Sequence, residues 1–427
     1  MLKIKPFPLS DSKILDIFSF LSNKKRIALA VSGGRDSCAL MLLISKWLSI
    51  KKINIEVHVL TVNHKLRKDS DSECQQVSEI ANAYGFNHQI LVWEHKEIKA
   101  SIQEKAREAR YKLMLEYIEE NMIDALLTGH TLDDQVETFI MRLSKGSGLD
   151  GLRSIQEVRD IDGVLLYRPL LSITRNMTTE ILKSSNREWI DDPYNQDQKF
   201  ERIKIRKNIH HLENLNISSE NISKSINRLA RSQQAIQHTM NYLFHELVEI
   251  NYLGYITIKK HKFDQCPEDL AIRIIERCLR IVNGEKRVSL SSLEKVYIDL
   301  IRTKKSKTIN GCVIKVLKYK YIITREIRDI RFIDLKLGDE IIWDNRFNIN
   351  LKSGAHSDFT IKNLGRSNNL GESLKNTYFE NLPSYIIDSL PGGFIKDKLV
   401  LLPNIHNIYS SSNLIVKFIS FEERTKI

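Results

Sequence analysis

The chain has 427 residues, 42% of them hydrophobic, and its formal net charge at pH 7 is +12. This length suffices for two or three domains, and the charge favours a polyanionic partner such as nucleic acid. The five cysteines form no CxxC pair, which argues against a zinc ribbon or an iron–sulfur site and favours free thiols in a reducing compartment. Since no run of about 18 apolar residues occurs, we expect a cytoplasmic protein with no membrane partner.

The first two hundred residues alternate between strand and helix patterns. Strands are predicted at residues 26–31, 53–62, 87–93 and 124–128, and helices at residues 36–48, 70–84, 101–121 and 133–143. This alternation predicts an α/β fold with a parallel, doubly wound sheet and helices on both faces. Ligands of such sheets bind beyond the carboxyl ends of the strands, where three polar clusters fall, at residues 32–37, 63–64 and 129–130.

The segment at residues 32–37 joins the first predicted strand to the first helix, and we call it the phosphate loop. Its members are Ser32, Gly33, Gly34, Arg35, Asp36 and Ser37. Backbone N–H groups and the positive end of a helix dipole meet at such a turn and attract an anion. The glycines let the backbone approach a phosphate closely, and the serines add hydroxyl groups. No Gly-Lys-[Ser/Thr] follows, so this is not a Walker A motif, and Asp36 would repel phosphate without a bound cation.

Two further motifs follow the second predicted strand. In Asn63-His64-Lys65-Leu66-Arg67, His64 and Arg67 are candidates to face a nucleotide. Arg107 and Arg110 lie three residues apart and share a helix face, where paired guanidinium groups suit a phosphate or a splayed base. Pairing with glutamates of the same helix is the alternative for these two arginines.

Residues 129–138, which we call the carboxylate motif, read Gly-His-Thr-Leu-Asp-Asp-Gln-Val-Glu-Thr. Asp133 and Asp134 lie four and three residues before Glu137, at a predicted helix start. These carboxylates either cap the helix or, together with His130, act beside the phosphate loop. There they could hold Mg²⁺ or bind a cationic substrate amine.

The pattern changes in the second half of the chain. Helices are predicted at residues 218–250, 267–282 and 291–302, a basic β-rich segment at 308–325, and near the end a helix at 374–380 followed by strands at 386–390 and 398–402. Lys224, Arg228 and Arg231 form a basic stripe on the first of these helices. The stripe is either a solvated face or a phosphate-contact face.

Taken together in this order, the motifs resemble those of the tRNA(Ile)-lysidine synthetases, which belong to the PP-loop ATP pyrophosphatases. SGGxDS alone is shared with GMP, asparagine and NAD synthetases and with tRNA thiolases. Its combination with NHxLR, ExxARxxRY and GHxxDDQxET is far more specific. The resemblance covers nearly the whole N-terminal domain and extends to residues 375–404. It departs at Lys145, where the family usually has Arg, and at Tyr194, where it usually has Ser.

The resemblance implies a chain of four parts. They are a PP-loop (HUP-like) catalytic domain at residues 1–215, a mainly helical, basic tRNA-binding linker domain at 216–332, a polar and turn-rich connector at 333–369, and a small α+β domain for tRNA recognition at 370–427. It also implies a monomer or a homodimer.

The implied reaction is an ATP-dependent ligation that forms a C–N bond. ATP, with Mg²⁺, adenylates the carbonyl oxygen at carbon 2 of the wobble cytidine of tRNA(Ile) with a CAU anticodon, releasing pyrophosphate. The ε-amine of free L-lysine then attacks that carbon and expels AMP. The product, lysidine, changes codon reading from AUG to AUA.

The roles of single residues follow as hypotheses. Residues of the phosphate loop, His64 and His130 are expected to bind ATP, with Mg²⁺ at Asp36. Candidates for holding lysine and taking its proton are Asp133, Asp134 and Glu137. Candidates for stabilising the adenylate or positioning the anticodon are Arg107, Arg110 and Arg206.

Three other functions compete with this one. A tRNA thiolase usually needs a cysteine pair near the site, and here Cys38 and Cys74 are isolated. An amide-forming ligase would need an ammonia source, for which no amidotransferase domain is recognised. A tRNA-binding protein with a decayed site would not keep the full set of motifs.

Overall fold

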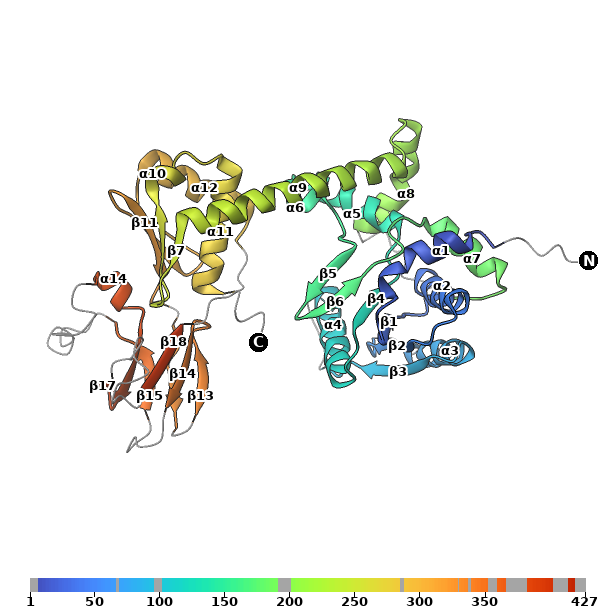
Figure 1. Ribbon diagram of the computed structural model, residues 1–427, viewed down its shortest axis with the longest axis horizontal. Helices are drawn as coiled ribbons and strands as arrows, with labels where there is room; N and C mark the ends of the chain where they lie inside the picture. Colours follow the sequence, from blue (N-terminus) through green and yellow to red (C-terminus); the bar gives the residue numbers. More distant parts are fainter. Residues whose placement is uncertain are drawn as a thin grey trace, which may run out of the picture. The chain divides into compact units, whose positions relative to one another are not determined.

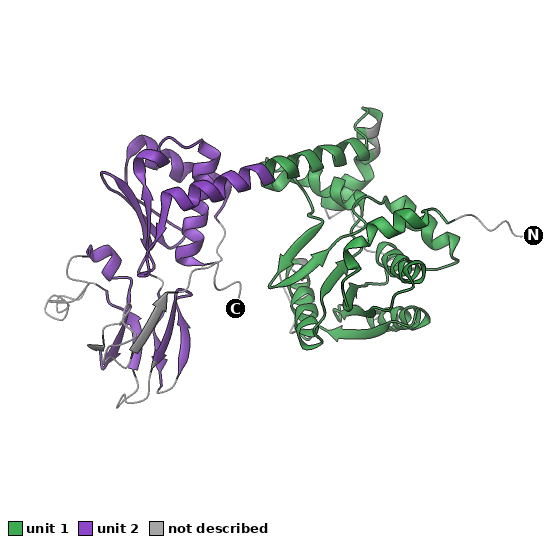
Figure 2. Ribbon diagram, in the orientation of Figure 1, with its two compact units in different colours: residues 1–233 green, residues 234–427 purple. Residues whose placement is uncertain are grey.

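The computed structural model describes residues 7–66, 69–95, 102–190, 201–284, 288–328, 330–336, 339–351, 359–365, 382–401 and 414–418. The chain divides into two compact units, Met1–Gln233 and Gln234–Ile427 (Figure 2). The division falls within α9 (Ser219–Leu247), a helix of 29 residues that is labelled in Figure 1. Among the helices of the described ranges, none combines the length and the apolar character needed to cross a membrane.

A six-stranded sheet in the order β3-β2-β1-β4-β6-β5 forms the centre of the first unit. Its strands are β1 (Arg26–Ala30), β2 (Glu56–Asn63), β3 (Asn87–Val92), β4 (Ala125–Thr128), β5 (Val158–Ile161) and β6 (Val164–Tyr167). All neighbouring pairs are parallel except β5 and β6. The predicted parallel α/β fold is therefore confirmed.

The hairpin of β5 and β6 was not predicted, although the sequence carries a signal for it. Asp162 and Gly163 connect the two strands, with φ angles of 51° and 85°. Two consecutive residues of positive φ form the type I′ turn that suits a two-residue hairpin, and Asp-Gly is a typical sequence for it. The hairpin adds an antiparallel edge to the parallel sheet.

Helices cover both faces of this sheet. The described helices of the first unit are α1 (Asp11–Ile17), a 3₁₀ turn at Ser19–Leu21, α2 (Arg35–Lys51), α3 (Ser70–Ala83), α4 (Ile102–Glu120), α5 (Leu132–Ser144), α6 (Leu149–Leu152), α7 (Arg175–Ser184), α8 (Glu201–Asn214) and the first part of α9. Of these, α5, α8 and α9 share a small core of their own. Ile27 and Leu29 of β1 pack in one core with Leu40 of α2, and Ala28 packs in a separate core with Met114 of α4. Because successive side chains of a strand point to opposite faces, these two cores lie on the two sides of the sheet, as a doubly wound fold requires.

The first part of the second unit combines helices with a five-stranded antiparallel sheet in the order β7-β8-β11-β10-β9. Its strands are β7 (Val248–Ile250), β8 (Ile256–Lys259), β9 (Lys307–Ile309), β10 (Cys312–Val316) and β11 (Lys320–Arg325), and its helices are α10 (Lys260–Phe263), α11 (Glu268–Asn283), α12 (Leu290–Ile298) and a π-helical turn at Asp299–Thr303. The helix predicted to reach residue 250 ends at Leu247, because residues 248–250 pair with β8.

The last part of the chain is built from two small antiparallel sheets, β12-β15-β16-β17 and β13-β14-β18. Their strands are β12 (Ile333–Leu335), β13 (Glu340–Trp343), β14 (Phe347–Leu351), β15 (Phe359–Asn363), β16 (Pro391–Ile395), β17 (Lys398–Leu401) and β18 (Leu414–Phe418), with a short helix, α14 (Ser384–Ile387), before β16. The strand predicted at residues 386–390 was wrong, since its first residues end α14. The helix predicted at residues 374–380 lies outside the described residues.

The segment predicted as a connector, residues 333–369, differs from that expectation. It contains β12 to β15, and Trp343, Phe347 and Ile349 are completely buried in the core of this part. In β14 and β15 polar residues alternate with the apolar ones, as expected where one face of a sheet is solvated. These polar residues give the segment an overall composition similar to that of a linker, which explains why a connector was predicted.

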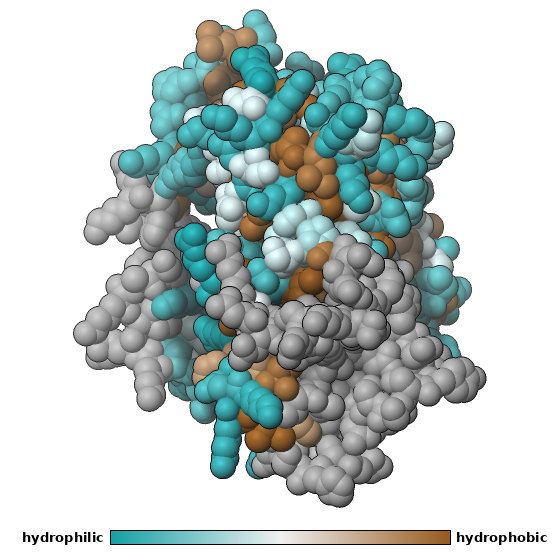
Figure 3. Space-filling model, turned by 90° about the vertical axis from the view of Figure 1, so that its left-hand side faces the viewer, coloured by the Kyte–Doolittle hydropathy of each residue, from teal (hydrophilic) through white to brown (hydrophobic). Residues whose placement is uncertain are grey.

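The surface drawn in Figure 3 is mainly hydrophilic among its coloured residues, and hydrophobic side chains lie between the hydrophilic ones in small groups. Of the described hydrophobic side chains, some of the most exposed are Tyr319 and Phe332, at 74% and 70%. Isolated hydrophobic residues of this kind are normal on a protein surface.

Candidate active site

The phosphate loop follows β1 at the carboxyl end of the parallel strands, as predicted, and its last three residues form the first turn of α2. Gly33 has a φ of +80°, which an L side chain rarely adopts. The Ser37 hydroxyl donates to the carbonyl oxygen of Gly34 at 2.8 Å and accepts from the N–H of Ser32 at 3.3 Å. Gly34 precedes α2 and has no side chain to cap it, so the first N–H groups of α2 are suited to an anion.

A second glycine brings the carboxylate motif against this loop. A Cβ atom on Gly129, which follows β4, would lie 2.7 Å from the carbonyl oxygen of Asp36 and 3.0 Å from the backbone nitrogen of Ser37. Only a residue without a side chain fits at this distance from another backbone. The close contact places the start of α5 next to the start of α2.

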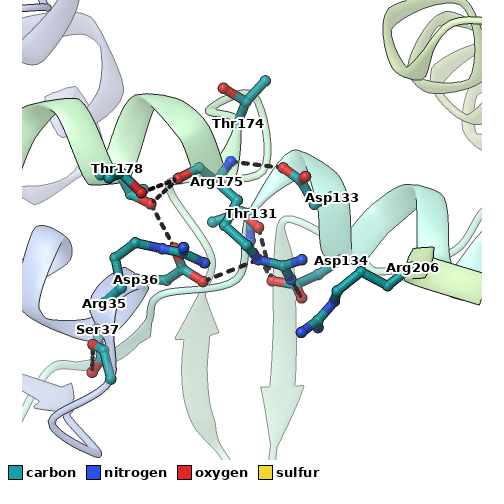
Figure 4. Close-up of polar contacts among 12 residues, drawn as sticks. Arg35, Asp36, Ser37, Thr131, Asp133, Asp134, Thr174, Arg175, Thr178 and Arg206 are labelled. Carbon is teal, nitrogen blue, oxygen red and sulfur yellow. Dashed lines mark hydrogen bonds and ion pairs between the residues drawn. The ribbon is translucent and has the colours of Figure 1, made fainter. Parts of the chain in front are cut away.

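Arg175, the first residue of α7, lies between the phosphate loop and the carboxylate motif (Figure 4). Its Nη1 donates to Glu137 Oε1 and its Nη2 to Asp134 Oδ1, each at 2.9 Å. Its Nε lies 3.6 Å from Asp36 Oδ2, and its backbone N–H donates to Asp133 Oδ2 at 2.7 Å. Arg175 belongs to none of the predicted motifs, although it touches all four predicted carboxylates.

Asp36 is held by α7 and by its own neighbour. The Thr178 hydroxyl donates to Asp36 Oδ1 at 2.6 Å, and Arg35 Nε donates to the same oxygen at 3.2 Å. These bonds direct the carboxylate towards α7 (Figure 4). Thr178 is completely buried.

Two more arginines, both from α8, reach the carboxylate motif. Arg202 donates to Glu137 Oε2 at 2.6 Å and to Asp134 Oδ1 at 2.7 Å, and Arg206 donates to Glu137 Oε1 at 2.8 Å. The side chain of Glu137 is 0% exposed. Burial acts to raise the pKa of Glu137, but the hydrogen bond from Arg206 and the charges of Arg175 and Arg202 lower it to about 2. Glu137 is therefore a weak base.

The other two carboxylates of the motif differ in their surroundings. Asp134 Oδ2 accepts from the backbone N–H and the hydroxyl of Thr131, at 2.8 and 3.0 Å, and so caps α5. Asp133 is less buried. Within the part of the chain that the structure describes, its Oδ1 accepts no hydrogen bond.

His130 lies beside these charges. Its Nδ1 is 2.8 Å from the Thr128 hydroxyl. Burial lowers the pKa of His130 to about 4, with Asp134 acting in the opposite direction. Three cations add to the effect of burial: Arg168, Arg202 and Arg107. At neutral pH the ring is therefore uncharged. Of these three arginines, Arg107 is one of the predicted site residues.

His64 and Arg110, two further predicted residues, meet beyond the ends of β2 and β3. His64 Nε2 is 3.5 Å from Arg110 Nη2, and the His64 ring meets the Trp93 ring edge-on at 5.7 Å. Burial and the charge of Arg110 lower the pKa of His64 to about 4. Arg107 lies over the ring of Tyr111 at 5.5 Å. Arg67 and residues 191–195 lie outside the described residues.

Lys145 does not reach the phosphate loop in this arrangement. Its Nζ pairs with Glu201 Oε2 at 2.7 Å, and both side chains are largely exposed, at 60% and 43%. Exposed pairs of this kind hold side chains weakly.

Residues 9–213 include the phosphate loop and the carboxylate motif next to it, and they match the family model described as PP-loop domain. The first unit thus belongs to the class of PP-loop ATP-binding domains. The chain is 32% identical to a tRNA(Ile)-lysidine synthase of Wolbachia pipientis wMel over 94% of its own length and 92% of the relative. It is 31% identical to that of Orientia tsutsugamushi (strain Boryong), over 97% and 96% of the two chains. The chain belongs to the tRNA(Ile)-lysidine synthase family.

A solved structure with a similar fold is the U34-tRNA thiolase NcsA from Methanococcus maripaludis. The two share 19% identity with a TM-score of 0.45, over 51% of this chain and 76% of the thiolase. This similarity is too low to bear on function. The predicted family is thus confirmed by the sequence relatives, and the chain is a PP-loop enzyme of tRNA modification.

Proposed function

We propose that this enzyme joins free L-lysine to carbon 2 of the wobble cytidine of tRNA(Ile) with a CAU anticodon, through an adenylated cytidine. The observation that carries the proposal is the contact of Gly129 with the phosphate loop, which brings an anion site and a set of carboxylates together. The reaction needs both, because ATP is an anion and lysine arrives as a cation. Its close sequence relatives are named for this modification.

ATP would place its phosphates at the uncapped N-terminus of α2. Within the described residues, no group of three or more His, Cys, Asp or Glu side chains could hold a metal ion. This fits Mg²⁺, which usually binds one or two carboxylates together with substrate phosphates rather than a cage of protein ligands. Asp36 is the carboxylate that we assign to it, and the ion would neutralise the polyphosphate.

Lysine must lose a proton before its ε-amine can attack. Among the three candidate carboxylates, Glu137 is the weakest base because its pKa is about 2, and Asp134 caps α5. Asp133 has an oxygen without a partner among the described residues. We therefore assign Asp133 to hold the amine and to accept its proton.

The arginines near His130 and His64 are suited to the third substrate. Arg107 and Arg110 are exposed, and guanidinium groups bind phosphates and stack on unpaired bases. Modification of a cytidine requires that the base leaves its stack. We propose that these two arginines position the anticodon next to the adenylate.

The alternative of a tRNA thiolase is disfavoured by the cysteines. The Cys38 thiol is buried and donates to the carbonyl oxygen of Gly33 at 3.1 Å, and burial raises its pKa to about 12. Cys74 is also buried. A thiol of this kind is a poor nucleophile and a poor cluster ligand, because the reactive species is the thiolate.

The experiment that tests the proposal uses the purified enzyme, ATP, Mg²⁺ and radiolabelled lysine. The substrates are tRNA(Ile) with a CAU anticodon and, as a control, the methionine tRNA with the same anticodon. We expect acid-insoluble label on the first tRNA alone, with release of AMP. An Asp36→Ala variant should lose the label and retain tRNA binding. Release of AMP with a sulfur donor, and none with lysine, would contradict the proposal and favour a thiolase.

A further inference from the structure

Helix α7 connects the two motifs of the site, and neither its Arg175 nor its Thr178 has a role in the proposal above. The two residues lie three positions apart, so both point from the same face of the helix. Thr178 contacts Asp36. Arg175 contacts Asp36 and the carboxylate motif at once.

The carboxylate of Asp36 is a problem for a phosphate loop, because it is a negative charge in the first turn of α2. Without a bound cation it would repel the phosphates of ATP, so its direction decides whether it can hold Mg²⁺ next to them. In the structure, Oδ1 is bound by the Thr178 hydroxyl at 2.6 Å, and Oδ2 faces Arg175 Nε at 3.6 Å. The side chain of Asp36 is 22% exposed, so these contacts fix its direction without removing it from the site.

Arg175 makes contacts that only a guanidinium group can make together. Its three nitrogens face three carboxylates: Asp36, Asp134 and Glu137. A planar group with fixed donors can bridge several acceptors, whereas the ammonium of lysine is a single point charge. Its side chain is 13% exposed, which limits competition from water.

We propose that Arg175 and Thr178 are positioning residues for the adenylation step. Thr178 and Arg175 hold the Asp36 carboxylate in one direction, in which it can take the Mg²⁺ that we assign to it, and Arg175 keeps the phosphate loop in register with the carboxylate motif. This inference rests on the proposed function, since it assigns ATP to the phosphate loop and lysine to the carboxylate motif.

The decisive comparison is Thr178→Val against Thr178→Ser. Valine keeps the approximate shape and loses the hydroxyl, whereas serine keeps the hydroxyl. We expect Thr178→Val to raise the KM for ATP about tenfold and to lower kcat by a similar factor, since small misplacement of a group at a reacting centre is costly. The KM for lysine should stay unchanged, and Thr178→Ser should restore the wild-type values.

Thr179→Val is the matched control. Thr179 is the next residue of α7, and its hydroxyl donates to the carbonyl oxygen of Arg175 at 3.0 Å. The Thr178 hydroxyl oxygen lies 2.8 Å from the same carbonyl oxygen and shares its one proton between that oxygen and Asp36. Thr179 has no contact with Asp36. The control should therefore have wild-type kinetics, which separates the orientation of Asp36 from a general effect of losing a hydroxyl on α7.

Arg175→Lys tests the second half of the inference. It should raise the KM values for both ATP and lysine, because Arg175 serves both motifs. In Arg175→Ala, added methylguanidinium should recover part of the activity, whereas methylammonium should not. Arg175→Lys also keeps the inference testable if Thr178→Val does not fold.

A second readout needs no lysidine synthesis. ATP should raise the thermal unfolding temperature of the wild type and of Thr178→Ser, and raise that of Thr178→Val much less. Wild-type kinetics and a wild-type thermal shift in Thr178→Val would overturn the inference. If the wild type transfers no lysine, the proposed function fails, and the thermal shifts still decide whether Thr178 orients Asp36.

Discussion

At the scale of the residue, Glu137 illustrates how a single buried charge depends on its partners. Its carboxylate is 0% exposed and accepts hydrogen bonds from Arg175, Arg202 and Arg206. Bringing an unpaired carboxylate into such a place would cost several kcal/mol, and removing one member of a buried charge network costs about 3–5 kcal/mol. The three cations thus make the burial of Glu137 possible.

The stability of the first unit should therefore depend on the charge of Glu137. Its pKa is about 2 in the folded protein and 4.5 ordinarily. Because the pKa of Glu137 is lower in the folded protein, its ionised form stabilises the fold at pH values above the ordinary pKa. This stabilisation amounts to about 3 kcal/mol and is lost as the pH falls from about 5 towards 2. We expect Glu137→Gln to lower the free energy of unfolding by a similar amount at pH 7.

Urea denaturation at pH 7, 5 and 3 measures both effects. Between pH 5 and pH 3 the wild type should lose more stability than Glu137→Gln. A control is Glu180→Gln on α7, an exposed carboxylate, which should change the free energy of unfolding by less than about 0.5 kcal/mol. Equal pH profiles for the wild type and Glu137→Gln would contradict the assigned pKa.

The sequence analysis identified the carboxylates and not the central arginine. Asp36, Asp133 and Glu137 belong to motifs with glycines and dense polar residues, which mark the ends of strands. Arg175 is the first residue of an ordinary amphipathic helix. The recognisable sequence feature there is the helix cap, Thr174, and not the arginine. The partners of a long side chain are set by the tertiary structure, so the sequence around the arginine does not predict which residues it contacts.

At the scale of the element, the end of β4 and the start of α2 are tied together by Gly129. The site for an added Cβ atom lies 2.7 Å from one backbone atom of Asp36, and a backbone cannot move aside as a flexible side chain can. Substitution here must displace either the phosphate loop or the start of α5.

We expect Gly129→Ala to lower the stability by about 1–3 kcal/mol through overpacking and to weaken ATP binding. Equilibrium binding of ATP and thermal unfolding measure the two effects. Gly85→Ala is the control: Gly85 has a φ of +71° but no atom within 4 Å of an added Cβ. It should cost stability through backbone strain and leave ATP affinity unchanged. Normal ATP binding by Gly129→Ala would show that the contact does not shape the site.

At the scale of the whole molecule, the net charge of +12 is the main feature. In the first unit, the basic stripe on α9 consists of Lys224, Arg228 and Arg231, all of them exposed. Cations that neutralise phosphates release condensed counterions, which makes the affinity for nucleic acid fall as salt rises.

Replacing all three residues of the stripe with alanine distinguishes a solvated face from a phosphate-contact face. If the stripe contacts tRNA, the slope of the logarithm of the binding constant against the logarithm of salt concentration should become shallower by about 2–3. ATP binding should not change. An unaltered slope would assign the stripe to a solvated face.

The amino-acid sequence alone was enough to predict the parallel sheet, the phosphate loop, the carboxylate motif and the family. Each of these depends on local patterns, because strand and helix periods and glycine turns are properties of short segments. Three results came from the tertiary structure instead: Arg175 bridges the motifs, Glu137 is too weak a base, and β12 to β15 lie where a connector was predicted. Those results depend on which residues distant in the sequence come into contact and on how deeply they are buried. The pKa of a carboxylate, for example, is set by such neighbours and by burial, and not by its position in the chain.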